Sequence, residues 1–331
     1  MRIFVTGGCG FIGSNFIRYV FSETDDVQIT NLDLLTYAGN PANLADYEDD
    51  PRYRFLKGDI DDAGLLADVL PGHDAVVNFA AESHVDRSIT GSRPFLITNI
   101  VGANTLFEAA MREQIERFLH VSTDETYGSI REPDSFVEGD PLEPNSPYSA
   151  AKASADLLAR TYRETYGYPI TVTRTTNNFG PYQFPEKVIP LFITNLIDGD
   201  PVPLYGTGEN IRDWTYVIDN AAAQWLVLTT GDMGEIYNVG AGNEMTNREL
   251  TMRILSHFGA GEEMIRHVDD RPGHDLRYSV DAGKVRKLGW SPAVSFDEAL
   301  EQTISWYCAN EDWWRPLKAT GATQRQGLPP R

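Results

Sequence analysis

The chain has 331 residues, of which 41% are hydrophobic, and its 48 acidic and 28 basic residues give a formal net charge of −20. This length and composition indicate a globular protein with one large or two smaller domains, and the charge argues against non-specific binding to nucleic acid or to an anionic membrane. No apolar run approaches the roughly 20 residues of a membrane span, and the two cysteines, Cys9 and Cys308, indicate neither a disulfide nor a metal site, so we expect a cytoplasmic protein.

A glycine-rich turn follows the first predicted strand. The β-rich run of residues 2–6 leads into Gly7, Gly10 and Gly13, and an amphipathic stretch begins at Ser14. Strand, glycine turn and helix come in the order of a dinucleotide-binding unit, in which the pyrophosphate lies on the helix N-terminus. Because the spacing is G-x-x-G-x-x-G rather than G-x-G-x-x-G, an ordinary βα turn remains an alternative on this motif alone.

Acidic residues follow the next two predicted strands. The second strand, residues 27–32, ends at Asp33, where a carboxylate can accept hydrogen bonds from ribose hydroxyls. No Arg or Lys follows closely to favour a 2′-phosphate, so the sequence predicts NAD rather than NADP. Asp59, beside Ile60 after the third strand, is expected to contact adenine, although a solvated turn acid fits this position equally well.

Small residues follow the fourth predicted strand. Ala80 and Ala81 come directly after residues 74–79, where they leave room for a cofactor. Helical patterns near residues 62–70 and 95–113 alternate with these strands. The pattern predicts an α/β fold with a right-handed, doubly wound, mostly parallel Rossmann sheet.

Two stretches carry candidate catalytic groups. The run 117–121 leads to Thr123, Asp124 and Glu125, and two adjacent carboxyls at a strand end can serve as acid and base when their surroundings differ. Further along, Ser146 and Pro147 predict the start of a helix that runs to about Tyr166 and closes at Gly167. That helix carries Tyr148 and Lys152 on one face, where the ammonium is expected to lower the tyrosine pKa; a surface Tyr/Lys pair is the alternative.

These motifs resemble a known superfamily. The glycine turn, Ser122-Thr123 and Tyr148-x-x-x-Lys152 are similar to the extended short-chain dehydrogenases/reductases, which act on nucleotide sugars with tightly held NAD. From residue 1 to about residue 318 the chain resembles, more narrowly, the dTDP-glucose 4,6-dehydratase family, in residues 81–88 (AESHVDRS), 122–128 (STDETYG), 177–182 (NNFGPY), 185–187 (PEK) and 271–275 (RPGHD). Asp124 discriminates best, because the superfamily's 4-epimerases typically lack the Asp-Glu pair and its decarboxylases usually have Ser-Glu.

The resemblance implies a reaction. Tyr148 with Lys152 would remove the proton of the glucose 4-hydroxyl while hydride passes to NAD, Glu125 would remove the C5 proton, Asp124 would protonate the departing C6 hydroxyl, and Thr123 would hydrogen-bond the C4 oxygen. The product would be dTDP-4-keto-6-deoxyglucose. The alternatives are a 4-epimerase, a 4,6-dehydratase of a UDP- or CDP-sugar, and a non-catalytic NAD-sensing module.

The resemblance also implies two sets of binding residues. The cofactor set is Gly7, Gly10, Phe11, Ile12, Gly13, Asp33, Asp59, Ile60, Ala80, Ala81, Asn99, Ser122, Tyr148, Lys152 and Asn178. The substrate set is Ser83, His84, Thr123, Asn177, Lys187, Val188, Pro203, Tyr205, Arg212, Asn247, Arg271 and His274. Its cations would bind the diphosphate and Tyr205 would stack on the base, whereas Arg271 and His274 as surface groups and Tyr205 as a core aromatic are the alternatives.

The resemblance further suggests the organisation of the chain. Residues 1–176 form an NAD-binding domain to which part of 209–242 returns, residues 177–318 form a smaller mixed α/β nucleotide-sugar domain, and residues 319–331 form a disordered tail. The family implies a homodimer through helices near 98–114 and 148–166.

Overall fold

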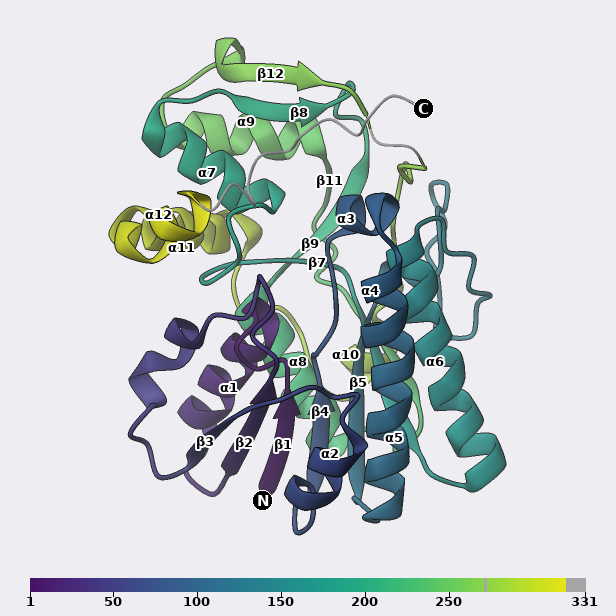
Figure 1. Ribbon diagram of the computed structural model, residues 1–331. Coiled ribbons are helices and arrows are strands. Elements are labelled where there is room, and N and C mark those ends of the chain that lie inside the picture. The colour runs from purple at the N-terminus through teal and green to yellow at the C-terminus, as the bar shows by residue number, and fades with distance from the viewer. Residues whose placement is uncertain (271–272, 320–331) are drawn as a thin grey trace.

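The computed structural model describes residues 1–270 and 273–319 of the chain (Figure 1). Within these residues a parallel sheet of seven strands has the order β10-β6-β5-β4-β1-β2-β3. The strands are β1 Arg2–Thr6, β2 Gln28–Asp33, β3 Tyr53–Lys57, β4 Ala75–Asn78, β5 Arg117–Thr123, β6 Ile170–Thr175 and β10 Ile236–Val239. The predicted doubly wound α/β fold is confirmed.

Helices cover both faces of this sheet because the strand side chains alternate. Ile3 and Val5 of β1 point into one apolar core, and Phe4 points into the other. The first core lies under α1 Phe11–Glu23, α8 Val217–Thr230 and α10 Gly283–Lys287. The second lies under α2 Ala63–Val69, α5 Ala103–Arg112 and α6 Pro147–Tyr166.

The predicted helical stretch of residues 95–113 is one continuous helical run with an irregular middle. It consists of α4 Arg93–Leu96, the π-helical turn η2 Ile97–Gly102 and α5. The short helix α3 Val85–Thr90 precedes it, and the 3₁₀ turn η1 Pro41–Tyr47 lies between β2 and β3. The run packs beside α6, so two helical segments lie side by side on this flank (Figure 1).

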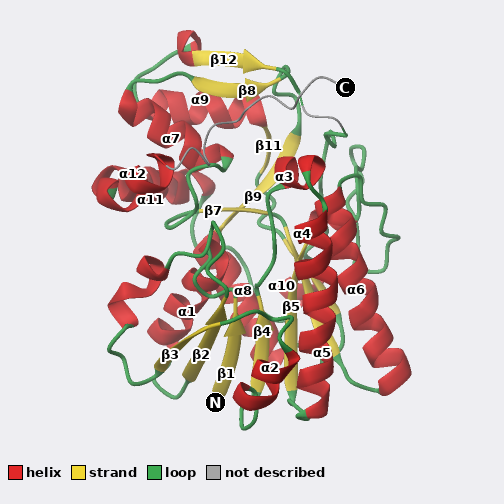
Figure 2. Cartoon of the chain, viewed as in Figure 1, coloured by secondary structure: helices red, strands yellow, loops and turns green. Residues whose placement is uncertain are grey.

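A smaller, mixed part lies beyond one end of the parallel sheet (Figures 1 and 2). Its strands are β7 Asn177–Phe179, β9 Ile211–Tyr216 and β11 Glu244–Thr246 in one sheet, and β8 Val202–Tyr205 with β12 Ile265–Val268 in another. Its helices are α7 Val188–Asp198, α9 Asn247–His257, α11 Phe296–Ala309 and α12 Glu311–Ala319, with the turn η4 Glu262–Met264. A third apolar core joins these elements.

Two further predictions concern the end of the chain and membrane-spanning segments. The disordered tail was expected to begin at residue 319, but Ala319 still belongs to α12, and residues 320–331 lie outside the described residues. Over the part of the chain that is described, none of the helices has the length and apolar character needed to span a bilayer.

Helix α6 begins and ends where the sequence predicts. Ser146 is its N-cap and forms a capping box with Ser149, and Pro147 is its first residue. At its other end Gly167 has φ +70°, in the left-handed region that favours glycine. Both ends of the helix that carries Tyr148 and Lys152 are therefore encoded locally.

The Gly167 cap gives a test of this local encoding. A Cβ at Gly167 would meet no atom within 4 Å, so Gly167→Ala adds backbone strain alone and should lower the free energy of unfolding by about 1 kcal/mol. Gly91 is equally open but has φ −161°, so Gly91→Ala should change stability by less than about 0.5 kcal/mol. Chemical denaturation of both variants measures the difference, and equal losses would contradict the strain argument.

Candidate functional site

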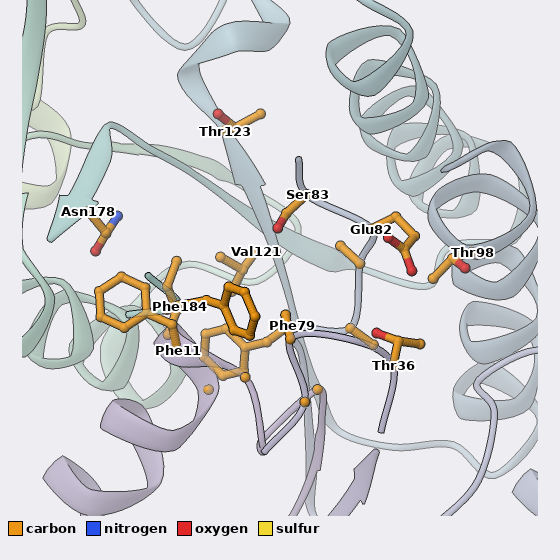
Figure 3. A pocket seen from close by; sticks show the side chains of 18 of the residues that line it. Phe11, Thr36, Phe79, Glu82, Ser83, Thr98, Val121, Thr123, Asn178 and Phe184 are labelled. Carbon is orange, nitrogen blue, oxygen red and sulfur yellow. The ribbon is translucent and has the colours of Figure 1, made fainter. Parts of the chain in front are cut away.

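A pocket lies at the carboxyl ends of the central strands (Figure 3). Strand β1 has β2 on one side and β4 on the other, so the order of the sheet reverses here, where open α/β sheets bind their ligands. The pocket is lined by the glycine turn, by Asp33, by residues 58–60 and 79–83, by residues 121–125 at and just after the end of β5, and by residues 175–178. The predicted cofactor and catalytic residues therefore lie largely in one cavity.

The three glycines of the turn have different surroundings. A Cβ at Gly7 would lie 2.5 Å from Ala80 N, and one at Gly13 would lie 2.4 Å from Gly7 O, so the chain's own packing requires both glycines. A Cβ at Gly10 would meet only Gly7 O, at 3.2 Å, so its missing side chain leaves space on the pocket side. Gly10 is the N-cap of α1 and supplies no side-chain cap, as fits a helix N-terminus that receives a phosphate.

Asp33 is buried where the sequence predicts a ribose-binding acid. Its Oδ2 accepts a hydrogen bond from Cys9 N at 2.9 Å and its Oδ1 accepts one from Leu35 N at 2.8 Å. Each carboxylate oxygen has a second lone pair for a ligand hydroxyl. Asp59 and Ile60 also line the pocket, whereas Asn99 lies behind it and exchanges two hydrogen bonds of 2.9 Å with the backbone of Glu82.

The Thr-Asp-Glu triplet forms the end of β5 and the 3₁₀ turn η3 Asp124–Thr126. Thr123 Oγ1 donates to Asp124 Oδ1 at 3.1 Å and accepts from Glu125 N at 3.3 Å. Asp124 is 3% exposed, and among the described residues its Oδ2 finds no hydrogen-bond partner. Three consecutive residues therefore aim a hydroxyl and two carboxyl groups at the pocket.

The two carboxyl groups have different environments. Burial raises the pKa of Asp124 to about 8, and the charges of Glu125 and Asp213 raise it as well, against the lowering effect of Arg212 and of the Thr123 hydrogen bond. Glu125 is half-buried. Asp124 is thus protonated at neutral pH, as a proton donor requires.

Tyr148 and Lys152 both line the pocket from α6, but they do not show the predicted pKa relation. Burial raises the pKa of Tyr148, the charges of Glu125, Asp124 and Asp156 raise it further, and only a hydrogen bond with Thr123 lowers it. Burial lowers the pKa of Lys152 to about 8, and its Nζ donates to Val121 O at 2.6 Å. The expected lowering of the Tyr148 pKa is therefore wrong, because burial and three carboxyl groups raise this pKa.

The substrate set is divided between the pocket and the smaller part. Ser83, Thr123, Asn177 and Lys187 line the pocket, and Lys187 Nζ donates to Ser83 O at 3.2 Å. His84 lies just behind it as the N-cap of α3. Outside this pocket, Val188 begins α7, Pro203 and Tyr205 lie on β8, Arg212 lies on β9, and Asn247 begins α9.

Tyr205 and His274 are brought together in the smaller part. Their ring centroids are 6.3 Å apart, Tyr205 OH donates to Asp86 Oδ2 at 3.0 Å, and His274 Nδ1 lies 2.6 Å from Asp270 Oδ1. Arg271, the remaining predicted cation, lies outside the described residues.

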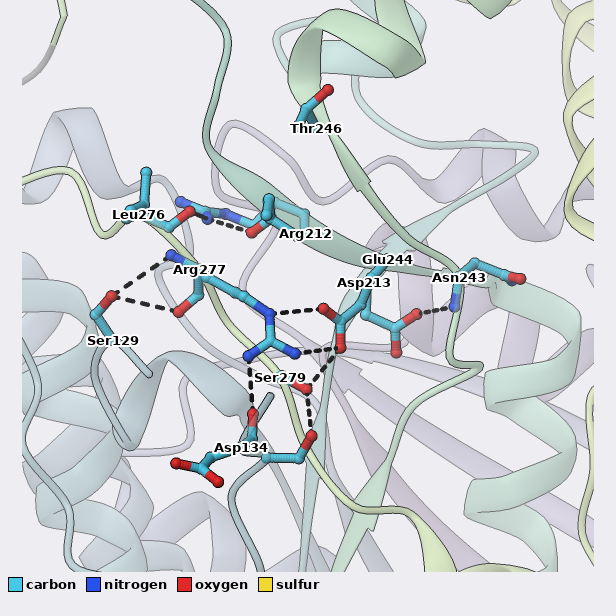
Figure 4. A network of polar contacts seen from close by, with 12 residues as sticks. Ser129, Asp134, Arg212, Asp213, Asn243, Glu244, Thr246, Leu276, Arg277 and Ser279 are labelled. Carbon is cyan, nitrogen blue, oxygen red and sulfur yellow. Dashed lines mark hydrogen bonds and ion pairs between the residues drawn. The ribbon is translucent and has the colours of Figure 1, made fainter. Parts of the chain in front are cut away.

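Arg212 is a buried residue and not a surface cation. It is 4% exposed, and its guanidinium donates to the backbone oxygens of Ile211 and Asp275, at 2.6 and 2.9 Å, and lies over the Tyr278 ring. It also bonds Leu276 O, next to the network in Figure 4. In that network Arg277 binds both carboxylate oxygens of Glu244 and the backbone oxygen of Asp134. The segment carrying Arg212's acceptors is thereby tied to both parts of the molecule.

Comparison with known proteins identifies the family of this chain. The family model described as GDP-mannose 4,6 dehydratase matches residues 4–303. The chain belongs to the GDP-mannose 4,6 dehydratase family.

Several known proteins are close to this chain in sequence. A dTDP-glucose 4,6-dehydratase of Streptomyces niveus is 53% identical over 324 residues, 96% of each chain. The low-salt glycan biosynthesis protein Agl12 of Haloferax volcanii is 53% identical over 312 residues, 94% of this chain and all of that one. The crystal structure of DesIV, a dTDP-glucose 4,6-dehydratase of Streptomyces venezuelae solved with NAD and a second ligand, is 54% identical with a TM-score of 0.93, covering 96% of this chain and 100% of that one.

Several residues that the sequence analysis did not name also line the pocket. Phe79 and Phe184 form an apolar wall with Phe11, and Tyr37, Glu82, Thr98 and Gln183 also line the cavity (Figure 3). Glu186 is buried at the pocket and pairs with Arg87 at 3.0 Å. Phe184 and Glu186 lie on either side of Pro185, next to the predicted Lys187. This closeness in sequence is the signal that could have identified them.

The raised pKa of Asp124 predicts a pH-dependent stability. Because the folded state favours the protonated acid, this contribution is complete below the ordinary pKa of 3.8 and is lost as pH rises through about 8. Relative to Asp124→Asn, the wild type should therefore lose stability steadily between these values. Urea unfolding at several pH values measures the difference; the exposed control Asp26→Asn should follow the wild type, and parallel curves for D124N would contradict the prediction.

Proposed function

We propose that the protein is an NAD-dependent dTDP-glucose 4,6-dehydratase, a carbon–oxygen lyase that forms dTDP-4-keto-6-deoxyglucose. The observation that carries the proposal is Asp124, a buried acid kept protonated beside Glu125 in the pocket that also holds Tyr148 and Lys152. Tyr148 and Lys152 suit an oxidation, whereas an acid beside a base suits elimination of water. Dehydratases of this name at 53% and 54% identity support the assignment.

The cofactor half of the pocket fits NAD. The space beside Gly10, the N-terminus of α1 and the buried Asp33 suit the pyrophosphate and the adenosine ribose. Among the described residues, Ser122 Oγ, Asn178 Oδ1 and Gln183 Oε1 are buried along this pocket without hydrogen-bond partners, so a polar ligand would satisfy them. The residues after Asp33, from Leu34 to Asn40, include no Arg or Lys for a 2′-phosphate.

The chain's own residues divide the proposed reaction among them. When bound, NAD would supply a positively charged ring that takes hydride from C4 of the sugar and returns it to C6. Tyr148 takes the proton of the 4-hydroxyl, with Lys152 as the neighbouring cation, and Thr123 hydrogen-bonds the C4 oxygen. The resulting ketone acidifies the C5 hydrogen, which Glu125 removes, and Asp124 gives its proton to the departing C6 hydroxyl, completing the loss of water.

Nucleotide recognition falls to the smaller part and to its border with the pocket. We assign the diphosphate to Lys187, Arg212, Arg271 and His274, because an anionic substrate needs local cations on a chain of net charge −20. Tyr205 would stack on the base, with Pro203, Val188 and Asn247 beside it. Residues 1–176, joined by α8 and β10, would then hold the cofactor, and residues 177–318 the nucleotide sugar.

The assay that tests the proposal compares two substrates. Purified protein incubated with dTDP-glucose should give the 4-keto-6-deoxy product, seen by NMR as a new C6 methyl group, and UDP-glucose should react poorly. A galactose-configured product without loss of water would instead identify a 4-epimerase, and no reaction with either substrate would favour a binding module.

Two neutral variants test the division of labour. Asp124→Asn cannot donate the proton, so loss of the C6 hydroxyl should slow roughly a hundredfold to ten-thousandfold while C4 oxidation stays detectable as NADH absorbance. Glu125→Gln should fail to eliminate water even from a preformed 4-keto intermediate. Normal elimination by E125Q would show that the base is assigned wrongly.

We also propose a cytoplasmic homodimer. Cys9 and Cys308 are free thiols, which suits a reducing compartment. Large apolar side chains are exposed along η2 and α6, at Ile97, Val101 and Leu157, the last being 54% exposed. These segments pack side by side, so their exposed side chains can form one apolar face for a second copy.

A charge on this face should separate the subunits. Light scattering of the wild type should give twice the chain mass of 36.9 kDa, and Leu157→Glu should shift it toward one chain mass because the interface would bury an unpaired carboxylate. Phe55, 37% exposed on the edge strand β3, provides the control Phe55→Glu. A monomeric wild type, or an unaltered dimer in L157E, would rule out this interface.

A further inference from the structure

Lys152 lies among buried polar residues of α6 and the neighbouring strands. Lys152 is 4% exposed, and its Nζ is fixed by the hydrogen bond to Val121 O of β5. Asp156 follows it by four residues, and side chains at this spacing are neighbours on one helix face. Asp156 is 3% exposed. A carboxylate and an ammonium are therefore buried together on the inner face of α6.

Arg174 of β6 fixes the Asp156 carboxylate. Its Nε donates to Asp156 Oδ2 at 2.8 Å, with the two side chains 4% and 1% exposed. Arg174 Nη1 also donates to Tyr127 OH at 2.7 Å, and that hydroxyl donates to Asn238 Oδ1 at 2.8 Å. Within the paired strands Arg174 lies opposite Ser122, the residue after Val121. The strand register thus places the Asp156–Arg174 pair beside the Lys152 anchor.

The second carboxylate oxygen distinguishes this pair from an ordinary structural ion pair. Asp156 Oδ1 is buried and, within residues 1–270 and 273–319, has no hydrogen-bond partner. A buried carboxylate oxygen without a partner is unfavourable unless a nearby positive charge compensates it. Arg174 binds Oδ2. Lys152 is the other buried cation on this face of α6, so its charge can compensate Oδ1.

We propose that Asp156 is a positioning residue for the reaction: its carboxylate, held by Arg174, keeps Lys152 charged and thereby keeps Tyr148 able to act as a base. The proposal rests on the proposed function, because it assigns Asp156 a role only through the Tyr148–Lys152 pair. The proton itself is handled by Tyr148, and Asp156 touches neither substrate nor cofactor.

The charged groups around Lys152 determine in which direction Asp156 shifts the pKa of Lys152. The buried groups are Asp156 on α6, His120 on β5, Arg174 on β6 and Asp124 on η3, and the half-buried groups are Tyr148 on α6 and Glu125 on η3. The neighbouring segments add Asp86 and Arg87 on α3, which bind Tyr205 and Glu186, and the exposed Arg93, Glu108 and Arg112 on α4 and α5.

Two of these neighbours bear directly on the Lys152 charge. Burial lowers the pKa of Lys152 to about 8, and the charge of Asp156 opposes this lowering. Burial also lowers the pKa of His120, and the charge of Lys152 lowers it further, so His120 adds no competing positive charge at neutral pH. The charge of Asp156 also raises the pKa of Tyr148, so its support for the reaction acts through Lys152. Removing the Asp156 charge should therefore let Lys152 lose its proton at a lower pH.

The test is the pH profile of dTDP-glucose turnover by the full-length protein with saturating NAD. Asp156→Asn keeps the side-chain volume and an acceptor for Arg174 but removes the charge, so the alkaline limb should move to lower pH by about one unit. Asp156→Glu restores the charge and should bring the limb back toward the wild-type position. A merely structural role would lower turnover equally at every pH, and an unmoved limb in D156N would overturn the proposal.

Lys152→Arg tests the same idea without touching Asp156, and so also covers a D156N chain that fails to fold. The guanidinium stays charged throughout the accessible pH range, so the alkaline limb should move above its wild-type position. A K152R profile with the limb unmoved would overturn the proposal. Failure of the wild type to convert dTDP-glucose would instead overturn the proposed function, and this inference with it.

Discussion

The hydrogen bond from Lys152 Nζ to Val121 O is the contact on which the site depends. It joins α6 to β5 at the point where β5 delivers Thr123, Asp124 and Glu125 to the pocket. Because the ammonium is buried and the bond is 2.6 Å long, sliding α6 along the sheet would leave a charged group without its acceptor. The position of Tyr148, one helical turn earlier, follows from this anchor, as does its relation to the triplet.

Burial then shifts the pKa values of Asp124 and Lys152 in opposite directions. The same exclusion of water raises the pKa of Asp124 to about 8 and lowers that of Lys152 to about 8. Each shift is limited by one nearby opposite charge, from Arg212 on Asp124 and from Asp156 on Lys152. An enclosed pocket can therefore keep an acid protonated without discharging its cation. That balance suits a reaction needing both oxidation and elimination.

The cofactor side depends on backbone packing more than on charge. Gly7 and Gly13 are required because the turn packs against Ala80 and against itself, whereas Gly10 leaves its side chain's space to the pocket. Asp33 is held by two backbone donors, so its carboxylate is oriented before any ligand arrives. The smaller part is tied to this frame through Arg277, which joins Glu244 of β11 to the loop at Asp134.

The sequence by itself determined the parallel α/β fold, both ends of α6 and the pocket residues at the strand ends, because each depends on local signals: alternating strand side chains, a capping serine, a left-handed glycine and acids after apolar runs. Only the tertiary structure decided the pKa of Tyr148 and the enclosure of Arg212. It also decided the Asp156–Arg174 pair and the aromatic wall of Phe79 and Phe184. Burial depends on how segments distant in the chain pack together, and burial is the largest influence on these charges.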